Sequence, residues 1–314
     1  MDRIKKSILT FFEKPNNATS LGVFRISIAL FSILQILFIL QDSTDLLGQY
    51  GWVQWELSHA LPNIWMPHIE DLYTLVQGFN SSEDQVLSGF LYLYLFVLVG
   101  VAVGWKTKIW ASIAWLMNLI LVSSFQAFIY GIDIFMQISL FYIMVMPTHK
   151  AFSIDCFLNP NLSPPNRYNQ MAIRTLQIHL CLVYLSAGIE KMLTTGWWNG
   201  EVIWFALMQP EFNQVNFSWL ANYPWIAMII GWSVLLLEVG YAIFMWIPKW
   251  RTFWLSCVIL MHIGISIFMG MPMFGVIMTI LSLTTWGKDC LKDMKRPTHK
   301  LDTFESATII QLNT

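Results

Sequence analysis

Apolar runs long enough to cross a lipid bilayer follow one another along most of the chain. A transmembrane helix needs roughly 17–25 such residues. Six runs stand alone, and a further block, 252–286, is too long for one crossing and is divided by the Pro- and Gly-containing stretch MGMPMFG. The pattern therefore predicts eight spans, of which the six single runs cover residues 21–40, 86–104, 109–128, 131–147, 171–190 and 224–246.

Composition supports the same interpretation. Hydrophobic residues make up 56% of the 314 residues and charged residues only 12%, whereas a soluble domain carries about 25% charged residues. We therefore expect an all-α fold, a polytopic membrane helical bundle of about eight transmembrane helices. Residues 1–20 form a basic N-terminus, residues 21–286 the transmembrane domain and residues 287–314 a tail.

The basic residues gather in alternate loops, which predicts the orientation. The loops 41–85, 125–132, 193–223 and 270–274 contain no Lys or Arg. Cytoplasmic loops carry the excess of Lys and Arg in membrane proteins. We therefore expect a multi-pass protein of the cell membrane with both termini in the cytoplasm. The basic residues assigned to that side are Arg3, Lys5, Lys6, Lys14, Lys106, Lys108, Lys150, Arg167, Lys249, Arg251, Lys288, Lys292, Lys295, Arg296 and Lys300.

The long outer loop, 41–85, is rich in tryptophan. Because aromatic residues favour the membrane interface, Trp52, Trp55 and Trp65 predict short amphipathic helices on the outer leaflet. A metal site built from His59, His68 and Glu70 is the weaker alternative, since their spacing matches no known ligand pattern. We predict no metal site.

Charged and polar residues inside the spans are functional candidates, because a charge in hydrocarbon is costly. Arg25 and Arg174 lie near the cytoplasmic ends of their runs, and we expect both to reach the interface by snorkelling. His179 lies mid-span, where a neutral histidine hydrogen-bonded to another helix is expected. Asp133 lies at the outer mouth of span four, where it is either solvated or functional.

Glu238 and His262 lie well inside spans six and seven, which are joined by a short turn and run antiparallel. Such neighbours can bring the two side chains together. A Glu–His pair would either hold a proton or orient a substrate, or else clamp the two helices.

Span five carries the sharpest candidate, because Lys191 is the single basic residue on the outer side. Tyr184, Ala187, Gly188 and Lys191 follow the i, i+3, i+4, i+7 spacing of one helix face. The two small residues would leave a floor for a flat ring or another helix. Lys191 would then act as a neutral amine base, or the small residues would serve packing while the lysine reaches water.

Three stretches carry a resemblance to a known family. VYLSAGIEKMLTTGWWNGE resembles a signature of the vitamin K-dependent γ-carboxylases and the wider HTTM family, and LMHIGISIFMGMPMFG and SSFQAFIYGID resemble two further stretches of it. The resemblance implies that Lys191 is the catalytic base and that a quinone or hydroquinone is the candidate cofactor. The chain departs from the carboxylases at Glu190 and Gln126 and lacks their large luminal half, so carboxylation of a protein substrate is not expected.

In size and overall character, the chain most resembles the sporulation-delaying protein B group of bacteria, whose members are needed to produce a secreted peptide toxin. This resemblance implies maturation or export of an antimicrobial peptide, with the lipid bilayer, a peptide toxin precursor and a small partner subunit as partners and no nucleic acid.

A quinone- or lipid-dependent membrane enzyme is the alternative function. Its site residues would be Lys191, Tyr184, His262 and Glu238 as catalytic groups and Gly188 and Ala187 as the cofactor floor. A transporter is disfavoured, since the chain shows no internal repeat. Whether any reaction is catalysed stays open.

Overall fold

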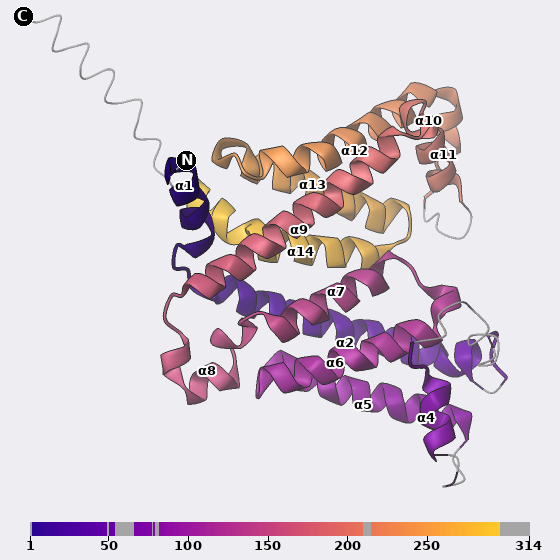
Figure 1. The fold of residues 1–314 in the computed structure, drawn as a ribbon. Helices are drawn as coiled ribbons and strands as arrows, with labels where there is room; N and C mark the ends of the chain where they lie inside the picture. The colour runs from indigo at the N-terminus through magenta and orange to yellow at the C-terminus, as the bar shows by residue number, and fades with distance from the viewer. Residues whose placement is uncertain are drawn as a thin grey trace, which may run out of the picture.

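The computed structural model describes residues 2–48, 50–53, 66–76, 78, 82–209 and 215–295, without the side chains of residues 2–6 and 8. Long helices lie side by side and run between two ends of the molecule (Figure 1). Each predicted apolar run forms one of them. The long helices are α2 (Thr19–Leu47), α5 (Glu83–Val103), α6 (Thr107–Ser124), α7 (Gly131–Val145), α9 (Arg167–Met192), α12 (Pro224–Phe244), α13 (Pro248–Phe268) and α14 (Pro272–Met294).

Length and apolar composition make this a multi-pass membrane protein. Among the described residues, six helices are long and apolar enough to cross a membrane, namely α2, α5, α6, α9, α12 and α13, and α7 is a shorter apolar helix. α14 packs against α13 along the same direction of the bundle but ends in a charged turn. The predicted all-α membrane bundle is confirmed.

The starts of these helices follow from local sequence. α12, α13 and α14 each begin with a proline, Pro224, Pro248 and Pro272, which suits the first helical turn because its amide would have no helical partner there. α5 begins with a capping box in which the Ser82 and Gln85 side chains and backbone amides bond reciprocally.

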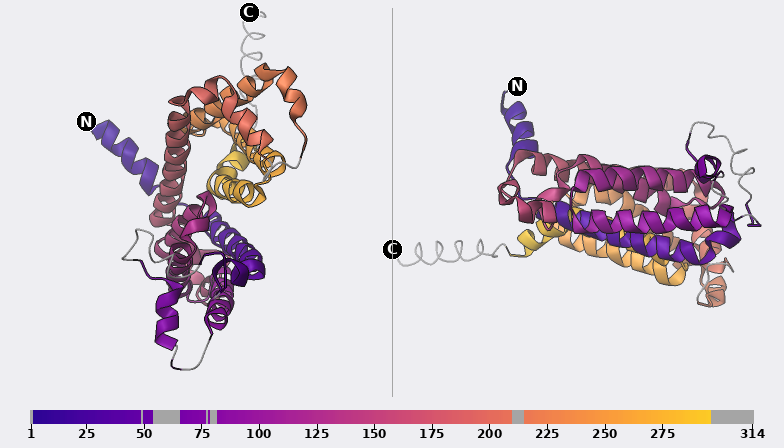
Figure 2. Two further views of the ribbon diagram at one scale, coloured as in Figure 1. Left: turned by 90° about the vertical axis from the view of Figure 1, so that its right-hand side faces the viewer. Right: turned by 90° about the horizontal axis from the view of Figure 1, so that it is seen from below.

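The helices form two halves (Figures 1 and 2). α9, α12, α13 and α14 make one half and α2, α5, α6 and α7 the other, and α14 joins them by packing on α2 and α7. Within the second half, polar side chains link three helices. Tyr94 donates to Asn118 at 3.1 Å and Asn118 donates to Gln137 at 2.6 Å, a type of interhelical contact common inside membranes.

Short helices close the two ends of the bundle. α1 (Asp2–Glu13), η3 (Thr148–Lys150), α8 (Ile154–Leu158) and η4 (Pro160–Leu162) lie at one end, which also holds the basic loops; we call it the basic end. α4 (Ile69–Val76), η2 (Gln126–Phe128), α10 (Thr195–Trp198), α11 (Glu201–Met208) and η5 (Ser218–Asn222) lie at the opposite end, the Lys191 end.

The predicted outer loop is described only in part. α2 continues into it as far as Leu47, and α4 provides one short amphipathic helix. Trp55, His59 and Trp65 lie outside the described residues, and so does the metal alternative that uses His59. Among the described residues, no group of three or more His, Cys, Asp or Glu side chains is placed to hold a metal ion.

Arg25 does not snorkel, which corrects the expectation from its position. Its side chain is 0% exposed. The guanidinium donates to the carbonyl oxygens of Thr148 at 3.1 Å and Ala102 at 3.4 Å, and also to that of Phe152. Because the loop after α7 folds over the end of α2, Arg25 finds carbonyl partners inside the protein and does not need to reach water.

Asp155 fixes the start of α6 from a distant loop. Its carboxylate accepts hydrogen bonds from the Lys106 amide at 2.7 Å, the Thr107 amide at 2.9 Å and the Thr107 hydroxyl at 2.8 Å. Partial burial raises the pKa of the Asp155 carboxyl, but these hydrogen bonds outweigh burial and hold that pKa below its ordinary value. Asp155 thus acts as an N-terminal cap supplied from α8.

We predict that Asp155→Ala lowers the free energy of unfolding by about 1–2 kcal/mol at pH 7, the usual cost of losing such a cap. A carboxyl with a lowered folded pKa stabilises the fold above its unfolded pKa, about 3.9, and loses that effect as the pH falls through the folded pKa. Thermal unfolding in detergent should therefore show a difference from wild type that shrinks below about pH 4. Asp42→Ala, an exposed aspartate in α2, is the control and should change little.

Candidate functional site

A salt bridge joins α9 to α12 near the Lys191 end. Lys191 Nζ lies 2.8 Å and 3.0 Å from the two carboxylate oxygens of Glu238. The Lys191 side chain is 25% exposed and the Glu238 side chain 10% exposed. The carboxylate therefore lies inside the bundle while the ammonium stands at its edge.

Deeper in the same half lies a buried polar cluster. The Tyr184 hydroxyl is 2.7 Å from His262 Nε2 and 3.5 Å from Ser282 Oγ. The Tyr184 ring stacks on Tyr241, with ring centroids 4.1 Å apart. These residues come from α9, α12, α13 and α14, so the cluster is the place where all four helices of this half meet.

The predicted pairing of Glu238 with His262 is wrong. The structure gives each residue a separate partner on α9, Lys191 for Glu238 and Tyr184 for His262. The sequence argument relied on α12 and α13 being neighbours in the chain. α12, however, also packs closely along α9, and the stronger electrostatic partner of a carboxylate is a lysine.

The small-residue floor of α9 is covered by α12. A Cβ on Gly188 would lie 2.7 Å from Val239 Cγ2 and 3.2 Å from Glu238 Cβ. Gly188 is buried, and Ala187 is partly buried beside it. Of the two occupants that the sequence allowed, a ring or a helix, the structure has the helix. The Gly188 surface does not fit the flat ring of a quinone.

The stretch TGWWNG forms a cap over the salt bridge. Trp197 in α10 places its ring 5.5 Å from Lys191 Nζ, within the range of a cation–π contact. The Trp198 indole donates to the Met192 carbonyl at 2.8 Å. Gly200 adopts a φ of 80° against α12, where a Cβ would lie 2.6 Å from the Met228 amide nitrogen. The glycine thus turns the chain back along α12.

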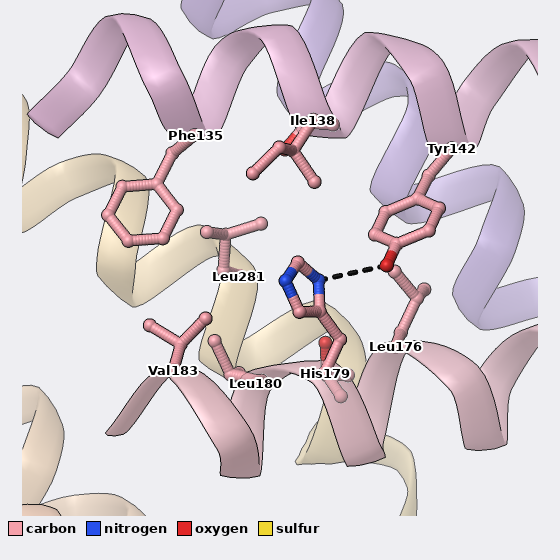
Figure 3. Close-up of a pocket in the computed structure, with 10 residues that line it drawn as sticks. Phe135, Ile138, Tyr142, Leu176, His179, Leu180, Val183 and Leu281 are labelled. Atoms are coloured by element: carbon pink, nitrogen blue, oxygen red, sulfur yellow. Dashed lines mark hydrogen bonds between the residues drawn. The ribbon is translucent and has the colours of Figure 1, made fainter. Parts of the chain in front are cut away.

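His179 bonds to another helix, as predicted. Its Nδ1 is 2.9 Å from the Tyr142 hydroxyl of α7, beside a cavity of about 30 Å³ (Figure 3). That volume holds about one water molecule. His179 and Tyr142 thus form a clamp between the two halves, away from Lys191.

Asp133 is bonded within the protein. It accepts from Gln35 Nε2 at 2.9 Å and from the Tyr130 amide at 3.1 Å. It also borders a largely apolar cavity of about 220 Å³ between α2, α6 and α7. This arrangement caps α7 and links it to α2.

Tyr241 and Ser282 belong to the buried cluster but were missed in the sequence. Both lie in apolar runs, where a lone hydroxyl carries little signal. Their position well inside the spans could have identified them, because a buried hydroxyl in a span needs a hydrogen-bond partner on another helix.

The fold and the site define a class: a multi-pass helical membrane protein with a lysine–carboxylate pair next to a buried tyrosine–histidine pair. Residues 13–287 match the HTTM domain, and the chain belongs to the HTTM domain family. No curated protein and no solved structure matches the chain.

The close contact at Gly188 gives a direct prediction. Gly188→Ala should push α12 away from α9 and lower the free energy of unfolding by about 1–3 kcal/mol, the usual cost of overpacking. Thermal unfolding of the purified protein in detergent measures this. Gly89→Ala is the matched control, since a Cβ there meets nothing within 4 Å, and it should be neutral or slightly stabilising. Equal effects of the two substitutions would contradict the packing at Gly188.

Proposed function

We propose that this HTTM protein is a membrane enzyme whose Lys191–Glu238 pair takes a proton from a lipid-soluble substrate at the outer membrane interface. The observation that carries the proposal is the bidentate contact between a partly exposed lysine and a buried carboxylate. A purely structural ion pair has no need of an open side, whereas a reactive amine needs one.

The salt bridge itself bears on how Lys191 acts as a base. In the resting pair, the carboxylate favours the ammonium form, which cannot accept a proton. Transfer of that proton along the 2.8 Å contact gives a neutral amine and a neutral carboxylic acid. Covering the pair with an apolar substrate removes water, which disfavours the two charges and favours the neutral forms. Glu238 then holds the proton, and Lys191 takes the next one from the substrate.

The substrate class follows from the surroundings. The base lies beside lipid-facing helices and beneath the Trp197 ring, so the substrate is a lipid-soluble molecule with a weakly acidic O–H group, such as a quinol or another lipid. His262 Nδ1 is buried, with no hydrogen-bond partner in the described part of the chain. It can hydrogen-bond a polar group of a substrate that enters between α9 and α13, while Tyr184 holds the other ring nitrogen.

We place the basic end in the cytoplasm and the Lys191 end outside the cell membrane. The described Lys and Arg residues of the connecting segments lie at the basic end, the arrangement that the positive-inside rule predicts. Both the start of α1 and the end of α14 lie there, so both termini are cytoplasmic. The site then faces the outer leaflet, where secreted molecules are within reach.

The biological role that we propose is maturation or export of a secreted antimicrobial peptide toxin, with a peptide precursor and a small subunit as partners. Exposed aromatic side chains surround the Lys191 end and favour an interfacial partner. They include Trp198, Trp219, Tyr223, Trp225 and Trp232. A membrane-associated peptide would meet this surface beside the salt bridge.

Both the base role of Lys191 and the role in toxin production can be tested in a strain that lacks the gene for this protein. The strain is complemented with variants, and the amount of active peptide in the medium is measured. Lys191→Arg keeps a positive charge for Glu238, but an arginine stays protonated and cannot act as a base. We expect Lys191→Arg and Lys191→Ala to abolish output while Lys191→Arg keeps the wild-type protein level in the membrane. Lys249→Arg, an exposed lysine at the basic end, is the matched control and should restore full output.

Two results would count against the proposal, and they are distinct. Normal peptide output from the deletion strain would exclude the role in toxin production. Full output from both Lys191 variants, with no output from the deletion strain, would exclude Lys191 as the base while leaving the peptide role intact.

A further inference from the structure

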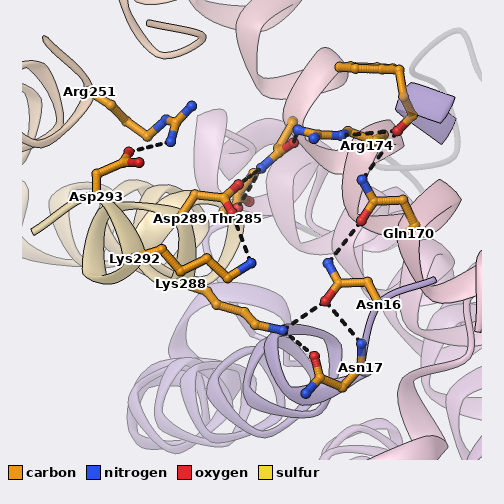
Figure 4. A network of polar contacts seen from close by, with 12 residues as sticks. Asn16, Asn17, Gln170, Arg174, Arg251, Thr285, Lys288, Asp289, Lys292 and Asp293 are labelled. Carbon is orange, nitrogen blue, oxygen red and sulfur yellow. Dashed lines mark hydrogen bonds and ion pairs between the residues drawn. The ribbon is translucent and has the colours of Figure 1, made fainter. Parts of the chain in front are cut away.

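A polar cavity of about 270 Å³ lies at the basic end, separate from the Lys191 site. It opens between α9, α13, α14 and the segment that joins α1 to α2. Figure 4 shows the side chains that converge there from these elements. Its position at the end of the membrane-spanning helices corresponds to the level of lipid headgroups.

The lining of this cavity is mainly cationic. Four cationic side chains and two carboxylates border it, which gives the lining a net charge of +2. The cations are Lys14, Arg174, Arg251 and Lys292, and the carboxylates are Asp289 and Asp293. Lys288 lies next to it and donates to the side-chain oxygens of Asn16 and Asn17.

Both carboxylates are already engaged within the protein. Asp293 forms an ion pair with Arg251. Asp289 accepts from Gln177 Nε2 at 3.0 Å and lies 3.7 Å from Lys292 Nζ. No carboxylate bonds to Arg174 or Lys14 in the described part of the chain, and Asp289 acts on the Arg174 guanidinium only as a nearby charge that offsets part of it.

Arg174 is held in a fixed orientation by neutral groups. Its Nη1 donates to Gln177 at 2.6 Å, and its guanidinium carbon lies 4.3 Å from the Phe11 ring centroid. A positioned guanidinium that keeps free donors is suited to an anion with several oxygens, above all a phosphate. Lys14 adds a flexible point charge at the rim.

The neighbouring helix α1 points to the same ligand chemistry. Its sequence, DRIKKSILTFFE, combines Arg3, Lys5 and Lys6 with apolar residues in the pattern of an interfacial helix. Basic pockets between transmembrane helices beside such segments are typical binding places for anionic headgroups. Cavity, charge and location thus agree.

We propose that this cavity, which we call the Arg174 cavity, binds the phosphate group of an anionic ligand. Arg174 contacts the phosphate oxygens and Lys14 closes the rim. The phosphate belongs either to a phospholipid headgroup or to a soluble phosphate compound. The proposal does not depend on the function assigned to Lys191, which lies at the other end of the bundle.

The test uses the full chain in nanodiscs of phosphatidylcholine, with phosphatidylglycerol or inorganic phosphate as the added ligand. Thermal unfolding and native mass spectrometry report binding. We expect Arg174→Gln and Lys14→Gln each to weaken binding about fivefold, the share of one charge near a membrane surface. Lys108→Gln removes the same charge at the basic end without lining the cavity, and it should bind like wild type.

The two ligands separate the two sources. Binding of phosphatidylglycerol that is weakened by both cavity substitutions, with no effect of inorganic phosphate, assigns the site to a lipid headgroup. The reverse pattern assigns it to soluble phosphate. Arg174→Gln also removes a contact with the Phe11 ring and could weaken binding through a folding defect. Lys14→Gln, at the exposed rim, removes a charge without losing such a contact. If neither cavity substitution weakens binding of either ligand more than Lys108→Gln does, the proposal is overturned.

Discussion

The salt bridge between Lys191 and Glu238 is the interaction on which the arrangement of one half of the bundle depends. The Glu238 carboxylate is buried within a span, where a charge without a partner is costly, and Lys191 supplies that partner from the edge of the bundle. Their 2.8 Å contact requires α9 and α12 to lie close together, and Gly188 permits that approach by offering no Cβ. The Trp197 ring and the turn at Gly200 then close over the pair.

Charged side chains are partnered and exposed differently at the two ends of the molecule. At the basic end, Arg25 is wholly enclosed and bonded to backbone carbonyls of folded loops, and Arg251 is paired with Asp293. Arg25 is inaccessible, as suits a structural role, and the charge of Arg251, which borders the Arg174 cavity, is compensated by its ion pair. Lys191 keeps an exposed side while its partner is buried. That asymmetry, more than the presence of a charge, is the reason for proposing a chemical role for Lys191.

The sequence was sufficient for the spans, because hydrocarbon thickness sets a length that hydropathy reveals directly. It also identified His179 as a residue bonded to another helix. It failed for Arg25, since proximity to a span end says nothing about whether a loop folds over it. It failed again for Glu238, whose partner depends on which helices touch. Adjacency in the sequence is a poor guide to helix contacts in a bundle of many helices. The hydroxyl of Ser282 went unnoticed because a lone hydroxyl in an apolar run carries little signal.

The most direct test of the central claim is a double-mutant cycle of Lys191→Met and Glu238→Gln, read out as the free energy of unfolding in detergent. Lys191→Met leaves the buried Glu238 carboxylate without its partner and should cost about 3 kcal/mol, whereas Glu238→Gln leaves the partly exposed Lys191 and should cost less. The double variant should cost clearly less than the sum, with a coupling energy of at least about 1 kcal/mol. Additive effects would show that the two side chains do not interact and would contradict the account of the site.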